Sequence, residues 1–105
     1  MKLLENAFVQ PDSTVLAENE KVKIEQFKIA DDLSTTTITV MPEQHYTFNS
    51  RSGILTTQVG TGTVTNGSDT HQLGMFNKIA IERGESITLI NNQAYPLVVN
   101  MITAN

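Results

Sequence analysis

The chain has 105 residues, a formal net charge of −4 and no cysteine. This length suits one domain with a modest core, and the missing cysteines exclude disulfide frameworks, thiolate metal sites and cysteine nucleophiles. Its 7 basic residues are scattered among 11 acidic ones, which argues against a nucleic-acid partner. No apolar run approaches the ~20 residues of a membrane span, and the start MKLLENAF is unlike a signal peptide, so we expect a cytoplasmic protein without a membrane partner.

The first residues differ in pattern from the rest of the chain. Residues 2–8 favour at most a short helical turn, because the turn residues 11–13 follow closely. We therefore expect an N-terminal arm over residues 1–14 and one β-domain over residues 15–105.

The first strands are predicted before residue 43. Residues 21–29 alternate apolar and polar side chains but change phase at Glu25-Gln26, which predicts a strand with a bulge there. Residues 30–32 are typical of a turn. Residues 35–42 form a β-branched strand that Pro42 ends.

Short β-branched segments separated by turn residues continue to the end of the chain. The pair Asn66-Gly67 predicts a tight hairpin, because both residue types adopt positive φ readily. The further predicted strands are residues 53–59, 62–65, 70–73, 78–82, 86–90 and 95–102. So many short strands must close on themselves or form two layers, since one open sheet would leave its edges unpaired.

The last strand is apolar on both faces. Leu97, Val99 and Met101 share one face, whereas Val98 and Ile102 share the other. This pattern predicts that both faces are covered. A second subunit, which would make a homodimer, or a terminal arm of the same chain would supply the cover.

The stretch RSGILTTQVGTGTV and the later segment from Gly84 to Asn91 contain two glycine motifs at a characteristic separation. Within residues 35–102 they resemble the motifs G-x5-H-x-H-x3,4-E-x6-G and G-x5-P-x-G-x2-H-x3-N of the cupin superfamily. The stretch RSGILTTQVGTGTV is most similar to cupin domains of the mannose-6-phosphate isomerase and mannose-1-phosphate guanylyltransferase families. The resemblance implies an all-β, single-domain cupin, a double-stranded β-helix with a jelly-roll-like barrel.

Cupin motifs hold a metal ion through histidine and glutamate side chains. If Gly60 closes the first motif, the resemblance places the four ligand positions at Thr47, Asn49, Gly53 and Ile87. None of these side chains is an imidazole or a carboxylate, which transition metals require at about 2.0–2.3 Å. We therefore expect these four positions to meet inside the barrel without holding a metal, and we expect no cofactor.

The alternation that starts at Gly53 predicts a narrow, mostly apolar interior. It directs Leu55, Thr57 and Val59 inward, where they would meet Ile87 and Leu89. The aromatic residues expected in the core or lining the interior are Tyr46, Phe48, Phe76 and Tyr95.

Several polar residues are candidates for contact with a ligand. His45 lies two residues before Thr47 and would share its face near the barrel mouth. Arg51 falls where the sugar-phosphate relatives also carry arginine, and its planar guanidinium suits phosphate or carboxylate. The predicted ligand-binding residues are His45, Thr47, Asn49, Arg51, Thr57 and Ile87.

Three functions are consistent with these residues. No nucleophile–base pair and no phosphate-binding glycine loop is recognisable. The first hypothesis is a metal-free cupin that binds a small organic or carbohydrate-like ligand, or serves as a scaffold, without catalysis. The second is a metal-independent sugar-phosphate isomerase or epimerase with His45 as general base and Arg51 as anion clamp. The third is a structural interaction module.

Overall fold

The computed structural model describes residues 14–105, which form ten strands and no helix. The strands are β1 (Thr14–Glu18), β2 (Val22–Ala30), β3 (Leu33–Val40), β4 (His45–Asn49), β5 (Gly53–Val59), β6 (Gly62–Thr65), β7 (Thr70–Leu73), β8 (Lys78–Ile81), β9 (Ser86–Ile90) and β10 (Leu97–Ala104). The described residues offer no helix that could span a membrane. The predicted all-β class is confirmed, whereas residues 1–13 of the expected N-terminal arm lie outside the described residues.

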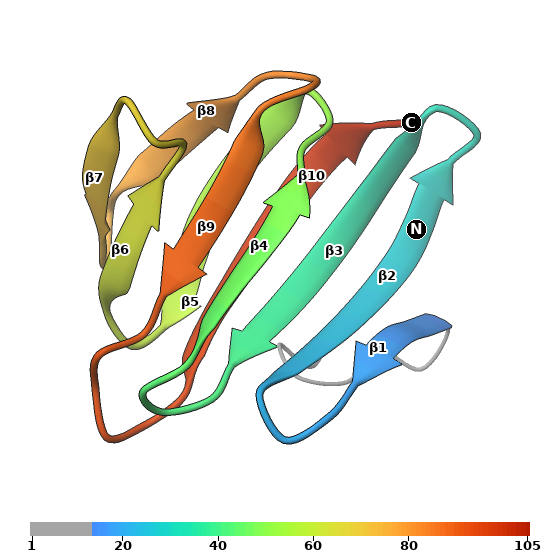
Figure 1. Cartoon of the computed structure of the whole chain (residues 1–105). Coiled ribbons are helices and arrows are strands. Elements are labelled where there is room, and N and C mark those ends of the chain that lie inside the picture. The colour runs from blue at the N-terminus through green and yellow to red at the C-terminus, as the bar shows by residue number, and fades with distance from the viewer. Residues whose placement is uncertain (1–13) are drawn as a thin grey trace.

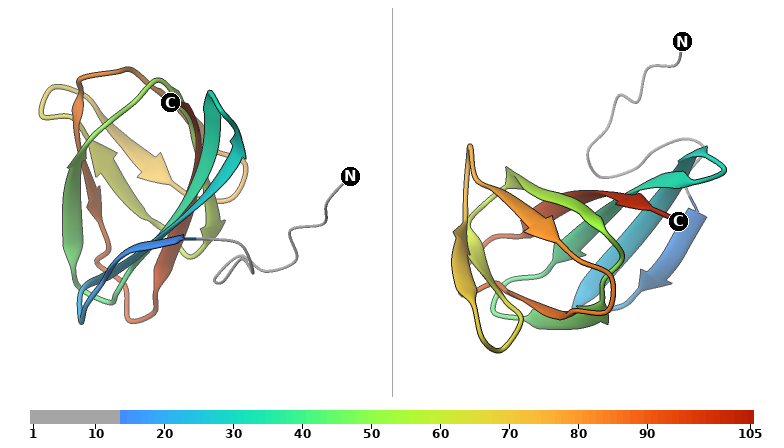
Figure 2. Two further views of the ribbon diagram at one scale, coloured as in Figure 1. Left: turned by 90° about the vertical axis from the view of Figure 1, so that its right-hand side faces the viewer. Right: turned by 90° about the horizontal axis from the view of Figure 1, so that it is seen from above.

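The strands form two antiparallel sheets that face each other (Figure 1). Sheet A has the order β1-β2-β3-β10-β5-β8, and sheet B has the order β4-β9-β6-β7. The layers curve around a common interior (Figure 2). Because sheet A has six strands and sheet B four, β1 and β2 extend past the edge strand β4, so the barrel is open on that side.

The core lies between the two sheets and draws on both. Leu55, Leu89, Leu97 and Val99 are completely buried, and burying a side chain of this size contributes about 1.5–3 kcal/mol. The inward orientation predicted for Leu55, Ile87 and Leu89 is therefore confirmed.

The prediction that Val59 also faces inward is wrong. The register between β5 and β10 shifts after the pair Val98–Val59, so that Val99 already lies opposite Thr57. This irregularity skips Gln58 and turns Val59 to the outer face, where it is partly exposed.

The bulge predicted at residues 25–26 is also misplaced. The pairing of β2 with β3 is regular through that position and shifts only after Lys28. An irregularity does face Glu25, but it lies in β1, between Val15 and Ala17. The apolar pattern changes phase because Phe27 alternates with Glu25 on the outer face of an unbroken strand.

The β6–β7 hairpin forms where it was predicted, with a wider turn. Residues 66–69 make a four-residue loop in which Gly67 alone adopts positive φ, at 97°. Asn66 contributes differently from the prediction: its Oδ1 accepts hydrogen bonds from the N–H groups of Ser68 and Asp69, at 2.9 and 2.7 Å.

Asn91 fastens one end of the barrel. Its buried side-chain amide donates to the carbonyl oxygens of Val40 at 2.9 Å, Met41 at 3.2 Å and Tyr95 at 2.9 Å. Its Oδ1 accepts from the N–H of Gln93 at 2.9 Å. One side chain thereby ties the end of β3 to the loop that leads into β10.

We expect Asn91→Ala to reduce the free energy of unfolding by about 3 kcal/mol, because it removes the donor of one buried and two partly buried carbonyl groups. Urea unfolding followed by circular dichroism measures the change. The neighbouring Asn92 is exposed, so Asn92→Ala is the matched control and should stay within about 0.5 kcal/mol of the wild type. Equal losses in the two variants would contradict this role of Asn91.

Candidate functional site

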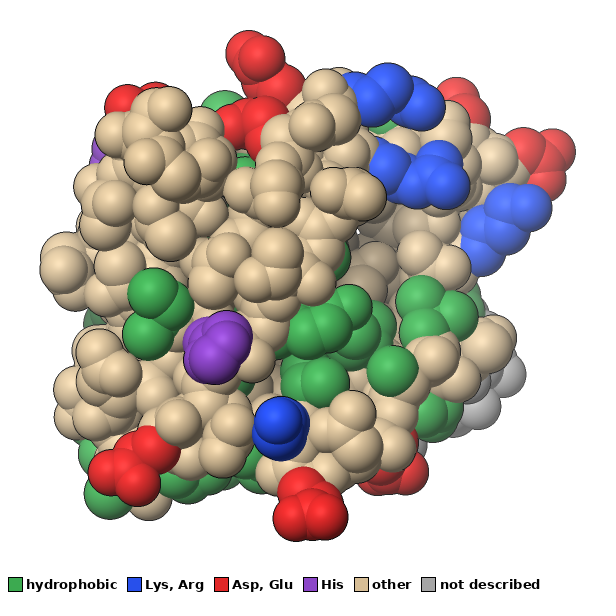
Figure 3. Space-filling view, in the orientation of Figure 1, with side chains coloured by type: hydrophobic (Ala, Val, Ile, Leu, Met, Phe, Trp, Pro, Cys, Tyr) green, Lys and Arg blue, Asp and Glu red, His purple; other side chains and the backbone are tan. Residues whose placement is uncertain are grey.

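A cavity of about 240 Å³ lies between the sheets on the open side of the barrel. Its lining comes from β1, β2, β3 and β10 of sheet A, from β4 of sheet B, and from residues 50–51. Figure 3 shows apolar side chains exposed in a hollow between β4 and the strands to its right, with basic side chains above it. The cavity is therefore open to a ligand from solvent.

The walls of the cavity are aliphatic on one side and aromatic on the other. Ile24, Ile38 and Met101 are buried on the inner face of sheet A. Tyr46 and Phe48 face them from β4, with ring centroids 5.9 Å apart and ring planes 19° apart. Such a slot suits the apolar part of a small molecule.

The alternation of β4 brings these two rings inside and sends Thr47 out. Thr47 is exposed, and its Oγ1 lies 2.8 Å from Oγ1 of Thr88 on the neighbouring strand. Phe48 instead pairs with the buried Ile87. The prediction that Thr47 faces the interior is therefore wrong, because the chain between β4 and β5 has one more residue than the count from Gly60 assumed.

A four-residue spacer, which the cupin motif also allows, shifts the two histidine positions to Tyr46 and Phe48. Gly53 and Ile87 keep their places in the motif. A Cβ atom at Gly53 would overlap the backbone carbonyl oxygen of Ile102, so no glutamate fits there without moving the backbone.

These four residues do not fit the metal ion that the resemblance implies. A single phenol is the one donor among them, and a protein metal site takes three or more ligands. Among residues 14–105, no group of three His, Cys, Asp or Glu side chains is placed to hold a metal ion.

Ser50 anchors the rim of the cavity. This residue is buried, its N–H donates to Glu85 O at 2.8 Å, and its carbonyl accepts from Gly84 N–H at 3.0 Å. Its hydroxyl donates to the carbonyl oxygen of Glu82. The backbone on which Arg51 stands is thereby fixed to the turn before β9.

Arg51 itself is free to meet a ligand. Its side chain is exposed at the cavity rim, and it forms no ion pair within residues 14–105. Asn49 is the second exposed polar residue at this rim. An unpaired guanidinium beside an apolar slot favours a ligand with a negatively charged group.

The other predicted ligand-binding residues lie away from the cavity. His45 is exposed at the start of β4, on the same outer face as Thr47. Ile87 packs in the core, on the side of a separate 70 Å³ hollow. The Thr57 hydroxyl is buried and finds no hydrogen-bond partner in the described part of the chain, but it does not line the cavity.

Sequence reasoning therefore placed Arg51 at the rim, as the structure does, but it placed Asn49 inside the barrel, whereas Asn49 is exposed at the rim, and it missed part of the lining. Gln26 and Thr36 enter it from β2 and β3, and no local signal marks them. Tyr46 and Phe48 were predicted to lie in the core or to line the interior. Their alternation with Thr47 indicates that the two rings share one face of β4.

Glu85 stabilises the turn to which Ser50 binds. Its Oε1 accepts from Glu82 N–H at 2.6 Å, and its Oε2 accepts from Asn66 Nδ2 at 2.8 Å. The Asn66 amide, followed by the Glu82 N–H, holds the pKa of the Glu85 carboxyl below its ordinary value. Gly84, with φ of 89°, gives this turn the left-handed residue that it requires.

Solved structures with the same arrangement include cupin-2 domain proteins. No family model and no curated protein matches the sequence. A cupin-2 domain protein from Rhodospirillum rubrum aligns with a TM-score of 0.75 and 12% identity, over 100% of this chain and 77% of that one. The polyketide cyclase RemF from Streptomyces resistomycificus aligns with a TM-score of 0.74 and 16% identity, over 99% and 79%.

A third similar structure is the Cupin_2 domain of an XRE family transcriptional regulator from Enterobacter cloacae, with a TM-score of 0.70 and 8% identity over 79% of this chain and 95% of that one. A cyclase and a regulator domain share this architecture, so the fold does not select a function. Together with the two sheets, these likenesses show that the chain has the cupin fold.

The Glu85 turn predicts a loss of stability in acid. A lowered pKa in the folded state stabilises the protein above the ordinary glutamate pKa of about 4.3, and this contribution disappears as the pH falls through the folded-state pKa. We expect Glu85→Gln and Asn66→Ala to flatten the decline in melting temperature below pH 5. Wild-type and variant curves that run parallel between pH 5 and pH 3 would contradict the assignment.

Proposed function

We propose that this cupin barrel binds a small organic molecule in the cavity between β4 and the inner face of sheet A. This proposal rests on the slot formed by Tyr46 and Phe48 against aliphatic side chains, with Arg51, which forms no ion pair within residues 14–105, at its mouth. Binding sites of this type combine an apolar wall with a few polar groups that orient the ligand. The apolar walls favour a ligand with an aromatic or aliphatic body.

The cavity bears on both the carbohydrate-like ligand and the metal-independent enzyme. The resemblance to sugar-phosphate cupins favours a carbohydrate-like ligand, whereas the aromatic and aliphatic walls favour a less polar one. An enzyme using His45 and Arg51 together is disfavoured. His45 begins β4 and Arg51 follows its end, so the extended strand, about 13 Å long, lies between them, and His45 faces away from the cavity.

The proposal predicts that filling the cavity abolishes ligand binding. Ala17 lines the cavity from β1, so Ala17→Leu should reduce the affinity for a ligand in the cavity at least tenfold. Amide NMR titration with small aromatic acids, aliphatic acids, sugars and sugar phosphates locates the site through shifts at residues 46–51. Ala94→Leu, in an exposed loop, is the control and should bind as the wild type does.

Two results would count against this function. One is that no compound in the set perturbs the cavity residues. The other is that the Ala17→Leu variant binds a ligand as tightly as the wild type while remaining folded.

The outer face of sheet A supports a second proposal, self-association of the chain. Ile54 and Ile102 pair across β5 and β10, are each about half exposed, and with Thr56 and Lys78 line an apolar hollow of about 220 Å³. The predicted cover of this outer face of β10 is incomplete in the described part of the chain: Val98 is buried, but Ile102 is half exposed.

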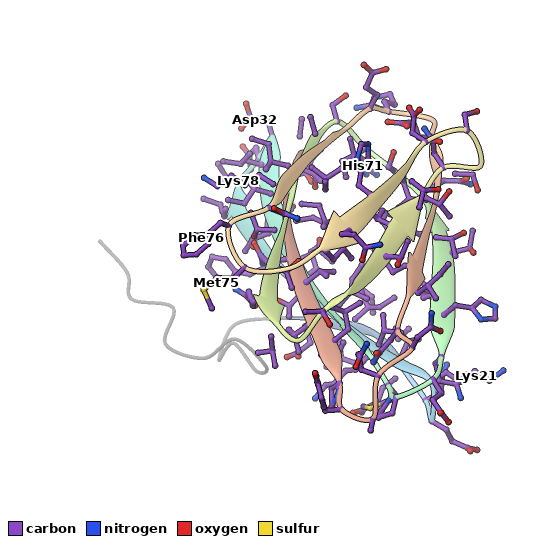
Figure 4. All side chains as sticks on the ribbon, turned by 90° about the vertical axis from the view of Figure 1, so that its left-hand side faces the viewer. Lys21, Asp32, His71, Met75, Phe76 and Lys78 are labelled. Carbon is purple, nitrogen blue, oxygen red and sulfur yellow. The ribbon has the colours of Figure 1, made fainter. Side chains whose placement is uncertain are left out.

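An exposed aromatic knob stands on the same side of the molecule. Phe76 is 93% exposed and adopts a φ of 74°, a conformation that costs an aromatic residue about 1–3 kcal/mol. Figure 4 shows Met75 and Phe76 projecting on the side where Lys78 lies. A knob and a hollow on one face are self-complementary, which is what a two-fold dimer requires.

We propose that a second copy of this chain occupies the hollow, with Phe76 of each copy entering it. None of the four residues that line the hollow is acidic, so two chains of net charge −4 meet there without opposed carboxylates. Such a dimer would also suit the scaffold role.

Replacing the knob should separate the copies and relieve the strain. We expect Phe76→Gly to be monomeric in analytical ultracentrifugation at about 100 µM, and to be about 1 kcal/mol more stable as a monomer, because glycine adopts positive φ freely. Tyr95→Ser removes another exposed aromatic ring, in the 91–96 loop, and should stay dimeric. A monomeric wild type, or a Phe76→Gly variant that still dimerises, would refute this interface.

A further inference from the structure

A second, polar hollow adjoins the cavity. It measures about 250 Å³, and it shares Gln26 and Arg51 with the cavity. Its other sides include Lys28 at the end of β2, Ser34 at the start of β3, and Asp31 in the turn between them. The two hollows therefore adjoin each other at Gln26 and Arg51.

The charges of this double hollow contrast with those of the whole chain. Among the side chains of residues 14–105 that line it, Lys28 and Arg51 are basic and Asp31 is acidic. These side chains therefore carry a net charge of plus one, in a chain whose formal net charge is −4. The two cations could therefore attract an anion to this end of the barrel.

Both cations are available to a ligand. Arg51 has no acidic partner in the described residues, and its backbone is held in place by Ser50. Lys28 Nζ lies 3.9 Å from Asp31 Oδ1, at the limit of an ion pair, and both side chains are more than half exposed. A pair of this kind contributes little, so Lys28 can turn toward an anion in the hollow at low cost.

We infer that the ligand is an amphipathic monocarboxylate. This inference rests on the proposed binding function. Its apolar body occupies the slot between Tyr46, Phe48 and Ile38, and its carboxylate lies in the polar hollow against Arg51 and Lys28. Gln26, which lines both hollows, stands where the body meets the head group. The planar guanidinium can donate two parallel hydrogen bonds to one carboxylate.

The charge count favours a single negative charge. A neutral head group would leave the guanidinium without the strong, charge-assisted bonds that it can form. A doubly charged phosphate would exceed the local charge of plus one and would place its second charge beside Asp31. A single carboxylate neutralises the net charge of plus one that the lining side chains carry.

The test uses matched pairs of head groups on the same body. We would titrate the full chain with 3-phenylpropionate, 3-phenylpropanamide and 2-phenylethyl phosphate by amide NMR at low salt. The acid should bind about tenfold more tightly than the amide, and the phosphate should not exceed the acid. Arg51→Gln should bring the affinity for the acid down to that of the amide, whereas Lys28→Gln should weaken the acid about threefold.

Arg83→Gln is the matched control, because Arg83 is the other arginine of the chain and lines neither hollow. It should bind the acid as the wild type does. If acid and amide bind equally well, or if Arg51→Gln changes nothing, the carboxylate inference is overturned while the binding function stands. If the phosphate binds most tightly, the single-charge inference is overturned. If none of the three shifts the cavity residues, both proposals fail.

Discussion

The inner face of sheet A is wider than sheet B can cover, and this mismatch shapes the molecule. Six strands face four, so the apolar side chains of the outermost strands have no strand of sheet B opposite them. Exposed apolar surface of this kind must be buried by something else or stay in contact with water at a cost of about 25 cal/mol per Å². The cavity is the space in which that cost would be recovered on binding a ligand.

The edge strand β4 decides what this space can bind, and both of its ends are fixed. At one end, Asn91 N–H donates to the carbonyl of Gln44, while the Asn91 side chain holds the end of β3. At the other end, Ser50 is bound to the turn before β9. Edge strands with a single neighbour are otherwise prone to move, so these two polar anchors keep the aromatic rings and Arg51 in a constant relation.

Much of the fold was predictable from the sequence, because its strands are short, alternate regularly and end at turn residues. The bounds predicted for residues 53–59, 62–65, 70–73 and 86–90 agree with β5, β6, β7 and β9. Local alternation predicts burial reliably where the other sheet covers the inner face of a strand, as for Leu55 and Leu89.

The predictions failed where distant parts of the chain determine the outcome. The face of β4 was inferred from the spacing to Gly60, and one extra loop residue reversed every side chain of the strand. Val59 was turned outward by an irregularity in its pairing with β10, which the sequence of β5 alone does not encode. Phe76 was placed in the core by its hydrophobicity, yet the loop between β7 and β8 projects it into solvent.

The same strand reversal changes how the binding site is to be understood. In a cupin that holds a metal, the positive charge sits inside the barrel and draws the polar end of a ligand inward. Here the four motif positions hold Tyr46, Phe48, Gly53 and Ile87, which make the interior apolar. The positive charge lies instead at the mouth, on Arg51 and Lys28. A ligand that satisfies both regions must enter with its apolar end first and leave its acidic group at the rim.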